Sequence, residues 1–381
     1  MEYENSSDSS SILSDIQTFV LPEEESRSEP KKLLNISFSG GGFKGCAFIG
    51  CIKAIYEHDL TKNIQAVAGT SAGALVATLF AAGCDYQYMK TCLSGVLRLF
   101  DRHRISWYSI VQNARNLTDQ FGVHDTDEIR AYFLECLNNA TNTTTDLTFQ
   151  ELYEITGIKL MISATCLDNQ TAFYFSHEAT KDTCVSEALC ISVNIPLLFT
   201  TKKFENKTLV DGCVVENLPM KCWPPEEIPN TIAFLVKSKN EIYNDDSKTQ
   251  IDNVYDYMQK LILAMKKESD AWYYEKYKDT IILIMASNIE AYKKVPSKSD
   301  INTVMHSAYF QTVKALQQRG FIDNNGAADG GFISSLIIAE EGIESEDEEA
   351  KVSNLKVAKQ MLASVTLFIL ILLIIKLLKR L

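Results

Sequence analysis

Residues Gln65 to Cys84 read QAVAGTSAGALVATLFAAGC, and this stretch decides how the surrounding chain folds. An apolar run ends abruptly at the pentapeptide Gly69-Thr70-Ser71-Ala72-Gly73, and the good helix formers Ala and Leu follow it. The pattern predicts a strand, a sharp turn and a helix. Glycines on both sides of Ser71 would let the strand and the helix pass close together.

A serine held between a strand and a helix in this way is typical of an enzyme nucleophile. It would lie at the N-terminus of the helix, where free amides and the helix dipole favour developing negative charge. A GxSxG string also arises by chance in glycine-containing chains, so the motif is weak evidence by itself. Other parts of the chain must support it.

A second glycine-rich turn precedes this one. Residues 34 to 39, LNISFS, predict a buried strand that runs into Gly40-Gly41-Gly42-Phe43-Lys44-Gly45, and an apolar helical pattern follows. A dinucleotide-binding loop would need an acidic residue at the end of the second strand, where this chain has Gly69-Thr70-Ser71. We favour a cradle of backbone amides for an oxyanion. A glycine turn that serves only close packing remains the alternative.

A third segment, residues 191 to 219, reads ISVNIPLLFTTKKFENKTLVDGCVVENLP. Residues 203 to 210 predict a hairpin whose second strand ends at Asp211-Gly212. An Asp before Gly at the end of a strand is usually a turn residue. The two glycine motifs upstream make a catalytic carboxylate the alternative interpretation.

Together these motifs resemble the patatin-like phospholipase family, whose members carry a GxGxxG loop, a GxSxG elbow and a later DG[GA] turn in that order. Here they read GGGFKG, GTSAG and DGC, and NIPLLF at 194 to 199 is similar to the family's Ile-Pro stretch. The resemblance covers residues 33 to about 236 and extends weakly to 321. It implies an α/β fold, a patatin-like three-layer sandwich with a central, mostly parallel sheet and a nucleophile elbow.

The resemblance also implies roles for individual residues. Ser71 would be the nucleophile and Asp211 the base of a Ser-Asp dyad, and no metal or cofactor would be needed. The oxyanion hole would be formed by Gly40, Gly41 and Gly42, and the motifs would be supported by Lys44, Gly45, Gly69, Gly73 and Gly212. A triad through His177 or His306 is the alternative to the dyad.

The chain departs from the family pattern at two places. Cys213 replaces Gly or Ala in the turn after Asp211, where a larger side chain could alter the geometry of the carboxylate. Cys190-Ile191-Ser192 replaces the usual Ala-Ser before the Ile-Pro stretch, and we expect this position to line the sheet rather than the reaction centre.

The predicted function is that of a serine lipid acyl hydrolase of the phospholipase A type, which cleaves fatty-acyl esters of membrane glycerophospholipids. A neutral-lipid esterase or acyltransferase with the same dyad is one alternative. An inactive, membrane-tethered lipid-binding or interaction protein is another.

Charge is distributed unevenly along the 381 residues, which carry a net charge of -12. Residues 1 to 30 hold eight acidic residues and one Arg, and residues 340 to 350 hold seven acidic residues and no base, so the rest is near neutral. No basic patch favours nucleic acid as a partner. The ten cysteines contain no CxxC pair and favour a reducing compartment. Residues 85 to about 142 predict mostly helix.

The C-terminal segment is predicted to be a membrane anchor. Residues 361 to 375, MLASVTLFILILLII, carry no charge and are flanked on both sides by Lys. We expect an acidic disordered leader over 1–30, a catalytic domain over 33–325, an acidic linker over 326–358 and a single-pass anchor over 359–381. The catalytic domain would face the cytosol, and the sequence does not determine the oligomeric state.

Overall fold

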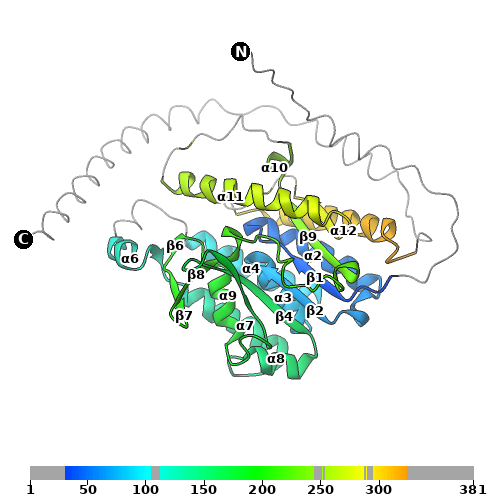
Figure 1. Ribbon diagram of the computed structural model, residues 1–381, viewed down its shortest axis with the longest axis horizontal. Coiled ribbons are helices and arrows are strands. Elements are labelled where there is room, and N and C mark those ends of the chain that lie inside the picture. Colours follow the sequence, from blue (N-terminus) through cyan, green and yellow to red (C-terminus); the bar gives the residue numbers. More distant parts are fainter. Residues whose placement is uncertain are drawn as a thin grey trace, which may run out of the picture. The chain divides into compact units, whose positions relative to one another are not determined.

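The computed structural model describes residues 31–103, 112–243, 251, 254–286, 289 and 295–323 (Figure 1). The predicted leader, linker and anchor all lie outside these residues. Within the described ranges, none of the helices combines the length and the apolar character needed to cross a bilayer.

A central sheet of eight strands organises the described part of the chain. Its main path runs β10-β9-β1-β2-β4-β8-β7, and β5 also pairs with β4. The strands are β1 (Asn35–Phe38), β2 (Ala66–Thr70), β4 (Lys159–Cys166), β5 (Thr171–Phe175), β7 (Lys202–Phe204), β8 (Lys207–Asp211), β9 (Thr231–Lys237) and β10 (Ile281–Met285).

The sheet is mixed, which corrects the prediction of a mostly parallel one. From β10 to β4 all neighbours are parallel, whereas β5, β7 and β8 pair antiparallel. The reason is local: β7 and β8 are joined by the two residues Glu205 and Asn206, and so short a connection can only join antiparallel strands. The hairpin itself was predicted and is confirmed.

Helices and a small second sheet complete the fold (Figure 1). In the second sheet β3 (Gly122–His124) pairs with β6 (Leu197–Phe199). The α-helices are α2 (Ala47–Glu57), α3 (Ala72–Ala81), α4 (Tyr86–Arg102), α6 (Ala114–Asp119), α7 (Asp127–Thr141), α8 (Phe149–Thr156), α9 (Val185–Ser192), α10 (Lys239–Tyr243), α11 (Val254–Lys276) and α12 (Lys298–Gln318). The 3-10 helices are η1 (Gly42–Cys46), η2 (Leu60–Asn63), η3 (Gly212–Val214) and η4 (Ile228–Asn230).

The two faces of the sheet bury different cores because side chains alternate along each strand. Ile36 and Phe38 of β1 point into the larger core, which includes residues of α2, α3, α4 and α12. Ser37 points the other way and accepts a hydrogen bond from the indole nitrogen of Trp223. That second face carries a smaller core that includes Leu218 and Tyr273 of α11. Helix α11 therefore packs on the sheet face opposite α3.

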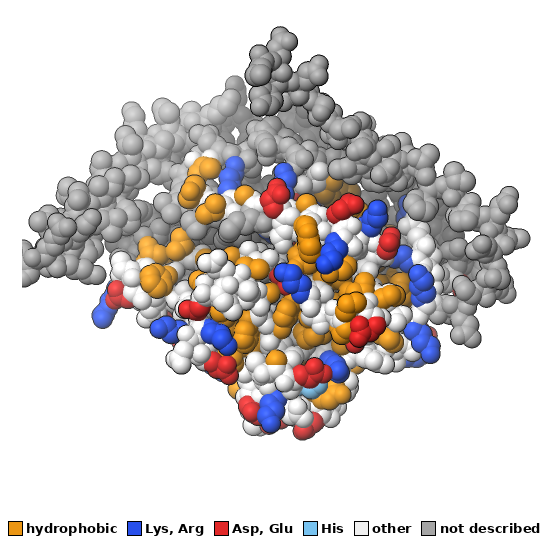
Figure 2. All heavy atoms as spheres, viewed as in Figure 1, with side chains coloured by type: hydrophobic (Ala, Val, Ile, Leu, Met, Phe, Trp, Pro, Cys, Tyr) orange, Lys and Arg blue, Asp and Glu red, His pale blue; other side chains and the backbone are white. Residues whose placement is uncertain are grey.

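Charged side chains are interspersed on the face of the molecule shown in Figure 2. Lys and Arg alternate there with Asp and Glu rather than gathering in one area, and apolar side chains lie between them. The face in view offers no large surface of one charge.

Candidate active site

Ser71 lies between β2 and α3, as the sequence predicts, with φ +54° and ψ -121°. This conformation is costly for a residue with a Cβ and persists only where the surroundings enforce it. Close packing enforces it here: a Cβ added at Gly73 would lie 2.4 Å from the carbonyl oxygen of Phe38, and one at Gly69 would lie 2.3 Å from that of Gly73. The strand–turn–helix prediction is confirmed.

Asp211 ends β8 and lies beside Ser71 because of the sheet register. On β4, Ser163 pairs with Thr70, the residue before Ser71, and the next residue, Ala164, pairs with Asp211. One strand therefore separates the serine turn from the aspartate, although 140 positions separate Ser71 and Asp211 in the chain. The carboxylate is fully buried.

The two carboxylate oxygens of Asp211 have different surroundings. Oδ1 accepts a hydrogen bond of 2.9 Å from the backbone N–H of Cys213. Oδ2 is buried and has no hydrogen-bond partner of good geometry among the described residues. Because the Cys213 contact uses the backbone, a Cys side chain in the third position of the turn leaves it intact.

Burial raises the pKa of Asp211 to about 6, since an ionised carboxylate is poorly solvated inside the protein. The N–H of Cys213, the hydroxyl of Ser71 and the more distant Lys266 oppose this shift. The Ser71 hydroxyl therefore lies near enough to the carboxylate to favour its ionised form. The structure brings these two predicted site residues together.

The glycine turn of residues 40–42 lies against the same serine. A Cβ added at Gly40 would lie 3.4 Å from Cβ of Ser71. The N–H of Gly40 already donates to the carbonyl oxygen of Asn217 at 2.9 Å. In the described part of the chain, the N–H groups of Gly41 and Gly42 have no such acceptor. Two of the three predicted oxyanion donors are therefore available.

The other motif residues fix the packing of these turns. Added Cβ atoms at Gly45 and Gly212 would lie 2.7 Å from Cβ of Ala72 and 2.7 Å from the carbonyl oxygen of Ser163. Lys44 is fully buried and pairs with Glu241. Burial lowers the pKa of Lys44 to about 8, and Lys266 adds to this effect while Glu241 opposes it.

Ser192 is a site residue that the sequence analysis misplaced. Its Oγ accepts a 2.9 Å hydrogen bond from the backbone N–H of Ser71 and donates one of 2.7 Å to the carbonyl oxygen of Ser163. The position before the Ile-Pro stretch therefore holds the serine turn and does not merely line the sheet. The sequence signal that could have identified Ser192 was its position within the motif-bearing segment of residues 191 to 219.

The two histidines of the alternative triad lie on other elements. The ring of His177 stacks on Tyr153 at 4.1 Å, and its Nε2 lies 3.7 Å from Glu178. His306 belongs to α12, where its ring packs against Phe310. Asp211 is the ionisable group that accompanies Ser71.

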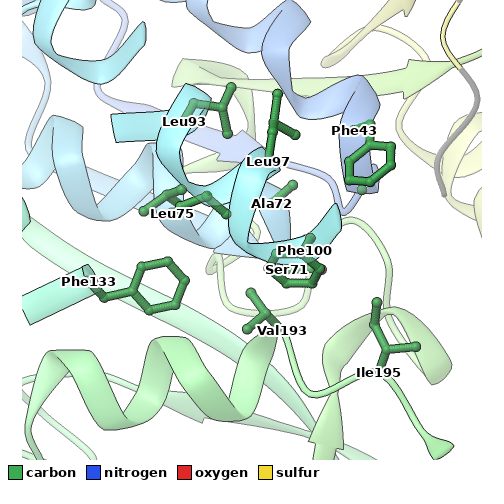
Figure 3. Close-up of a pocket in the computed structure, with 12 residues that line it drawn as sticks. Phe43, Ser71, Ala72, Leu75, Leu93, Leu97, Phe100, Phe133, Val193 and Ile195 are labelled. Atoms are coloured by element: carbon green, nitrogen blue, oxygen red, sulfur yellow. The ribbon is translucent and has the colours of Figure 1, made fainter. Parts of the chain in front are cut away.

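An apolar pocket opens beside Ser71 (Figure 3). In this view Phe133 of α7 lies at one side, Phe43 and Ile195 lie at the other, and Ser71 lies between them. The space open to the centre of a water-sized sphere is about 30 Å³. Helix α4 supplies one wall of the pocket through Leu93, Val96, Leu97 and Phe100.

Comparison with known proteins identifies a family and similar chains. The family model described as "Patatin-like phospholipase" matches residues 36–221. The uncharacterized protein R571 of Acanthamoeba polyphaga mimivirus is 27% identical over 64% of this chain and 80% of its own length. The probable lipid hydrolase 463L of Invertebrate iridescent virus 6 is 25% identical over 50% of this chain and 63% of its own.

Among solved structures, VipD from Legionella pneumophila superposes with a TM-score of 0.48 and 17% identity, covering 76% of this chain and 67% of VipD.

A mixed α/β sheet with a serine elbow and a buried carboxylate beside an apolar pocket is an arrangement that suits ester hydrolysis. The chain belongs to the patatin-like phospholipase family and is a lipid ester hydrolase.

Proposed function

We propose that the protein is a phospholipase A-type enzyme that cleaves fatty-acyl esters of membrane glycerophospholipids through Ser71 and Asp211. The observation that carries this proposal is the buried carboxylate of Asp211, whose ionised form the Ser71 side chain favours and whose Oδ2 has no hydrogen-bond partner among the described residues. A buried carboxylate oxygen of this kind is able to accept the proton that the serine loses.

The reaction would proceed in two halves. Ser71 Oγ attacks the ester carbonyl carbon and its proton passes to Asp211, while the amides of Gly41 and Gly42 donate to the oxyanion. The carbon–oxygen bond to the alcohol then breaks, and Asp211 returns the proton to the departing alcohol. In the second half Asp211 takes a proton from water, whose oxygen attacks the acyl carbon. The bond from this carbon to Ser71 Oγ then breaks, Asp211 returns the proton to Ser71 Oγ, and the fatty acid is released.

The pocket supports a lipid acyl group as the part of the substrate held next to Ser71. Its lining consists of Gly42, Ser71 and ten residues with apolar side chains. A fatty-acyl chain gains about 0.8 kcal/mol for each methylene transferred from water to such surroundings.

The C-terminal apolar run supports placing the enzyme at its substrate. Residues 361–375 would anchor the chain in a membrane, with the catalytic domain on the cytosolic side, and the acidic linker would act as a solvated spacer.

Reaction with a fluorophosphonate probe tests the nucleophile. Wild type should be labelled, Ser71→Ala should not be labelled, and Asp211→Asn should react at least about 10³-fold more slowly. Equal labelling of wild type and Ser71→Ala would refute the assignment. Fatty-acid release from phosphatidylcholine vesicles, compared with release from triglyceride emulsions, then separates the phospholipase from a neutral-lipid esterase.

A further inference from the structure

Helix α11 lies C-terminal to the segment that the family model matches, yet it reaches the candidate active site. Lys266, Ser269 and Asp270 are spaced i, i+3 and i+4 and therefore share one face of the helix. Both Lys266 and Asp270 are buried, at 6% and 2% exposure. This face turns toward the glycine turn of residues 40–42, Lys44 just after it and the chain that follows Asp211.

A first series of contacts runs from Lys266 to Lys44. Nζ of Lys266 lies 3.8 Å from Oε1 of Glu241, and the other oxygen of Glu241 pairs with Nζ of Lys44. Glu241 is itself held by the backbone N–H of Ser238, which donates to Oε2 at 2.6 Å. The backbone N–H of Lys44 donates to the carbonyl oxygen of Gly41 at 3.2 Å. The contacts therefore reach the C-terminal side of the glycine turn.

A second series runs from Asp270 to the N-terminal side of the same turn. Oδ1 of Asp270 accepts a 2.8 Å hydrogen bond from the side-chain amide of Asn217. The backbone carbonyl oxygen of Asn217 in turn accepts a hydrogen bond from the N–H of Gly40 at 2.9 Å. Oδ2 of Asp270 lies 3.7 Å from Nζ of Lys237. Ser269, between the two series, donates to the carbonyl oxygen of Val215 at 3.4 Å, just beyond Asp211.

Stability alone is a poor reason for such a network. Buried ion pairs lose much of their attraction to desolvation, and well-packed apolar residues of similar volume usually stabilise a fold as well or better. The contacts instead join the glycine turn of residues 40–42 to the turn that follows Asp211. Both turns must keep a fixed geometry for acyl transfer, because oxyanion donors act only when they point at the oxyanion.

We propose that Lys266 and Asp270 are positioning residues, which hold the glycine turn from both sides so that the amides of Gly41 and Gly42 face the oxyanion. The inference rests on the proposed function for the identity of the reacting group. Helix α11 thus completes the active site from the sheet face opposite the acyl pocket.

Hydrogen exchange in the full chain tests whether α11 holds the turn. In Lys266→Met and Asp270→Asn, amides within 38–48 and 211–218 should exchange about 10-fold faster, while those of α8 at 149–158 should not change. The matched controls are Lys267→Met and Glu268→Gln, which change exposed neighbours on the same helix. Equal exchange in variants and controls, or an equal rise in α8, would overturn the proposal.

Fluorophosphonate kinetics test whether this positioning matters for catalysis. The maximal inactivation rate should fall about 10- to 100-fold in Lys266→Met and Asp270→Asn. The reason is that amides of Gly41 and Gly42 that no longer point at the oxyanion stabilise the transition state less. The concentration giving half-maximal rate should change less than about two-fold, because the acyl pocket is formed by other residues. Unchanged maximal rates would refute the role. If wild type is not labelled at Ser71, the proposed function fails, whereas the exchange result still decides whether α11 holds the turn.

Discussion

At the scale of one residue, Asp211 shows how the fold would prepare the proposed base. Burial raises its pKa to about 6 from an ordinary value of 3.8. A carboxylate with this pKa is ionised at neutral pH and accepts a proton more readily than an exposed one. When Asp211 is ionised in both the folded and the unfolded state, this shift lowers the free energy of unfolding by about 3 kcal/mol.

The sign of this effect gives a prediction for pH. Below pH 3.8 the carboxyl is protonated in both the folded and unfolded states, and the penalty is absent; it grows between pH 3.8 and about 6 and is complete above that. Asp211→Asn should therefore raise the melting temperature at pH 8 by several degrees and have little effect at pH 4. The same variant should abolish hydrolysis, and wild-type activity should decline below about pH 6.

Thermal unfolding at the two pH values measures the stability effect, with Asp182→Asn as a control at an exposed turn. If Asp211→Asn were less stable than wild type at pH 8, the ionised carboxylate of Asp211 would not be destabilising the folded state. Full hydrolytic activity in that variant would contradict its role as base.

Single residues also show what a sequence can and cannot predict. Ser71 and Asp211 could be proposed because each belongs to a short motif of the family that the sequence resembles. The contacts of Ser192, Glu241 and Asp270 depend on side chains far away in the chain, and no spacing indicates them.

At the scale of elements, β4 and α4 have complementary tasks. Strand β4 sets the separation of the serine turn and the aspartate through two adjacent pairings. Helix α4 forms a wall of the pocket and would therefore limit how much of the proposed acyl chain fits. The sequence indicated mostly helix over the segment that contains α4, but it indicated neither the pairings of β4 nor the pocket wall.

Strand β3 shows why part of the fold could not be predicted. The sequence indicated mostly helix between residues 85 and 142, yet Gly122–His124 forms β3 because it pairs with Leu197–Phe199. The partner strand lies more than 70 positions away, and a three-residue strand has no periodicity of its own. The hairpin of β7 and β8 was predictable because its turn is local.

Narrowing the pocket from α4 should change the preferred acyl chain. Val96→Phe adds volume to the wall, so hydrolysis of long-chain esters should fall at least about 10-fold relative to that of short-chain esters. Rates with a series of nitrophenyl esters measure this ratio. Thr91→Phe, at an exposed position of the same helix, is the matched control. A parallel loss for all chain lengths would indicate general damage and refute α4 as the acyl wall.

At the scale of the whole molecule, the described fold extends well beyond the family match. The match ends at residue 221, whereas β9, β10, α11 and α12 follow it. Two of these elements, β9 and β10, extend the parallel part of the sheet, and α11 reaches the active site. The predicted catalytic domain over 33–325 included these elements, which the motifs alone did not define.

The predicted anchor makes the membrane a partner of the entire chain. Replacing Ile369 and Leu372 by Lys would place two charges in the middle of the apolar run, each costing about 2.5–3.5 kcal/mol in a bilayer. The wild-type chain should therefore stay with membranes during alkaline carbonate extraction, and the double variant should be released. Replacing Ser353 and Asn354 by Lys adds equal charge to the linker and should leave the chain membrane-bound. Binding of the lipid substrate alone would not withstand carbonate, so release of wild type would show that the C-terminal segment is not an anchor. Retention of the Ile369→Lys, Leu372→Lys variant would show that another segment holds the chain.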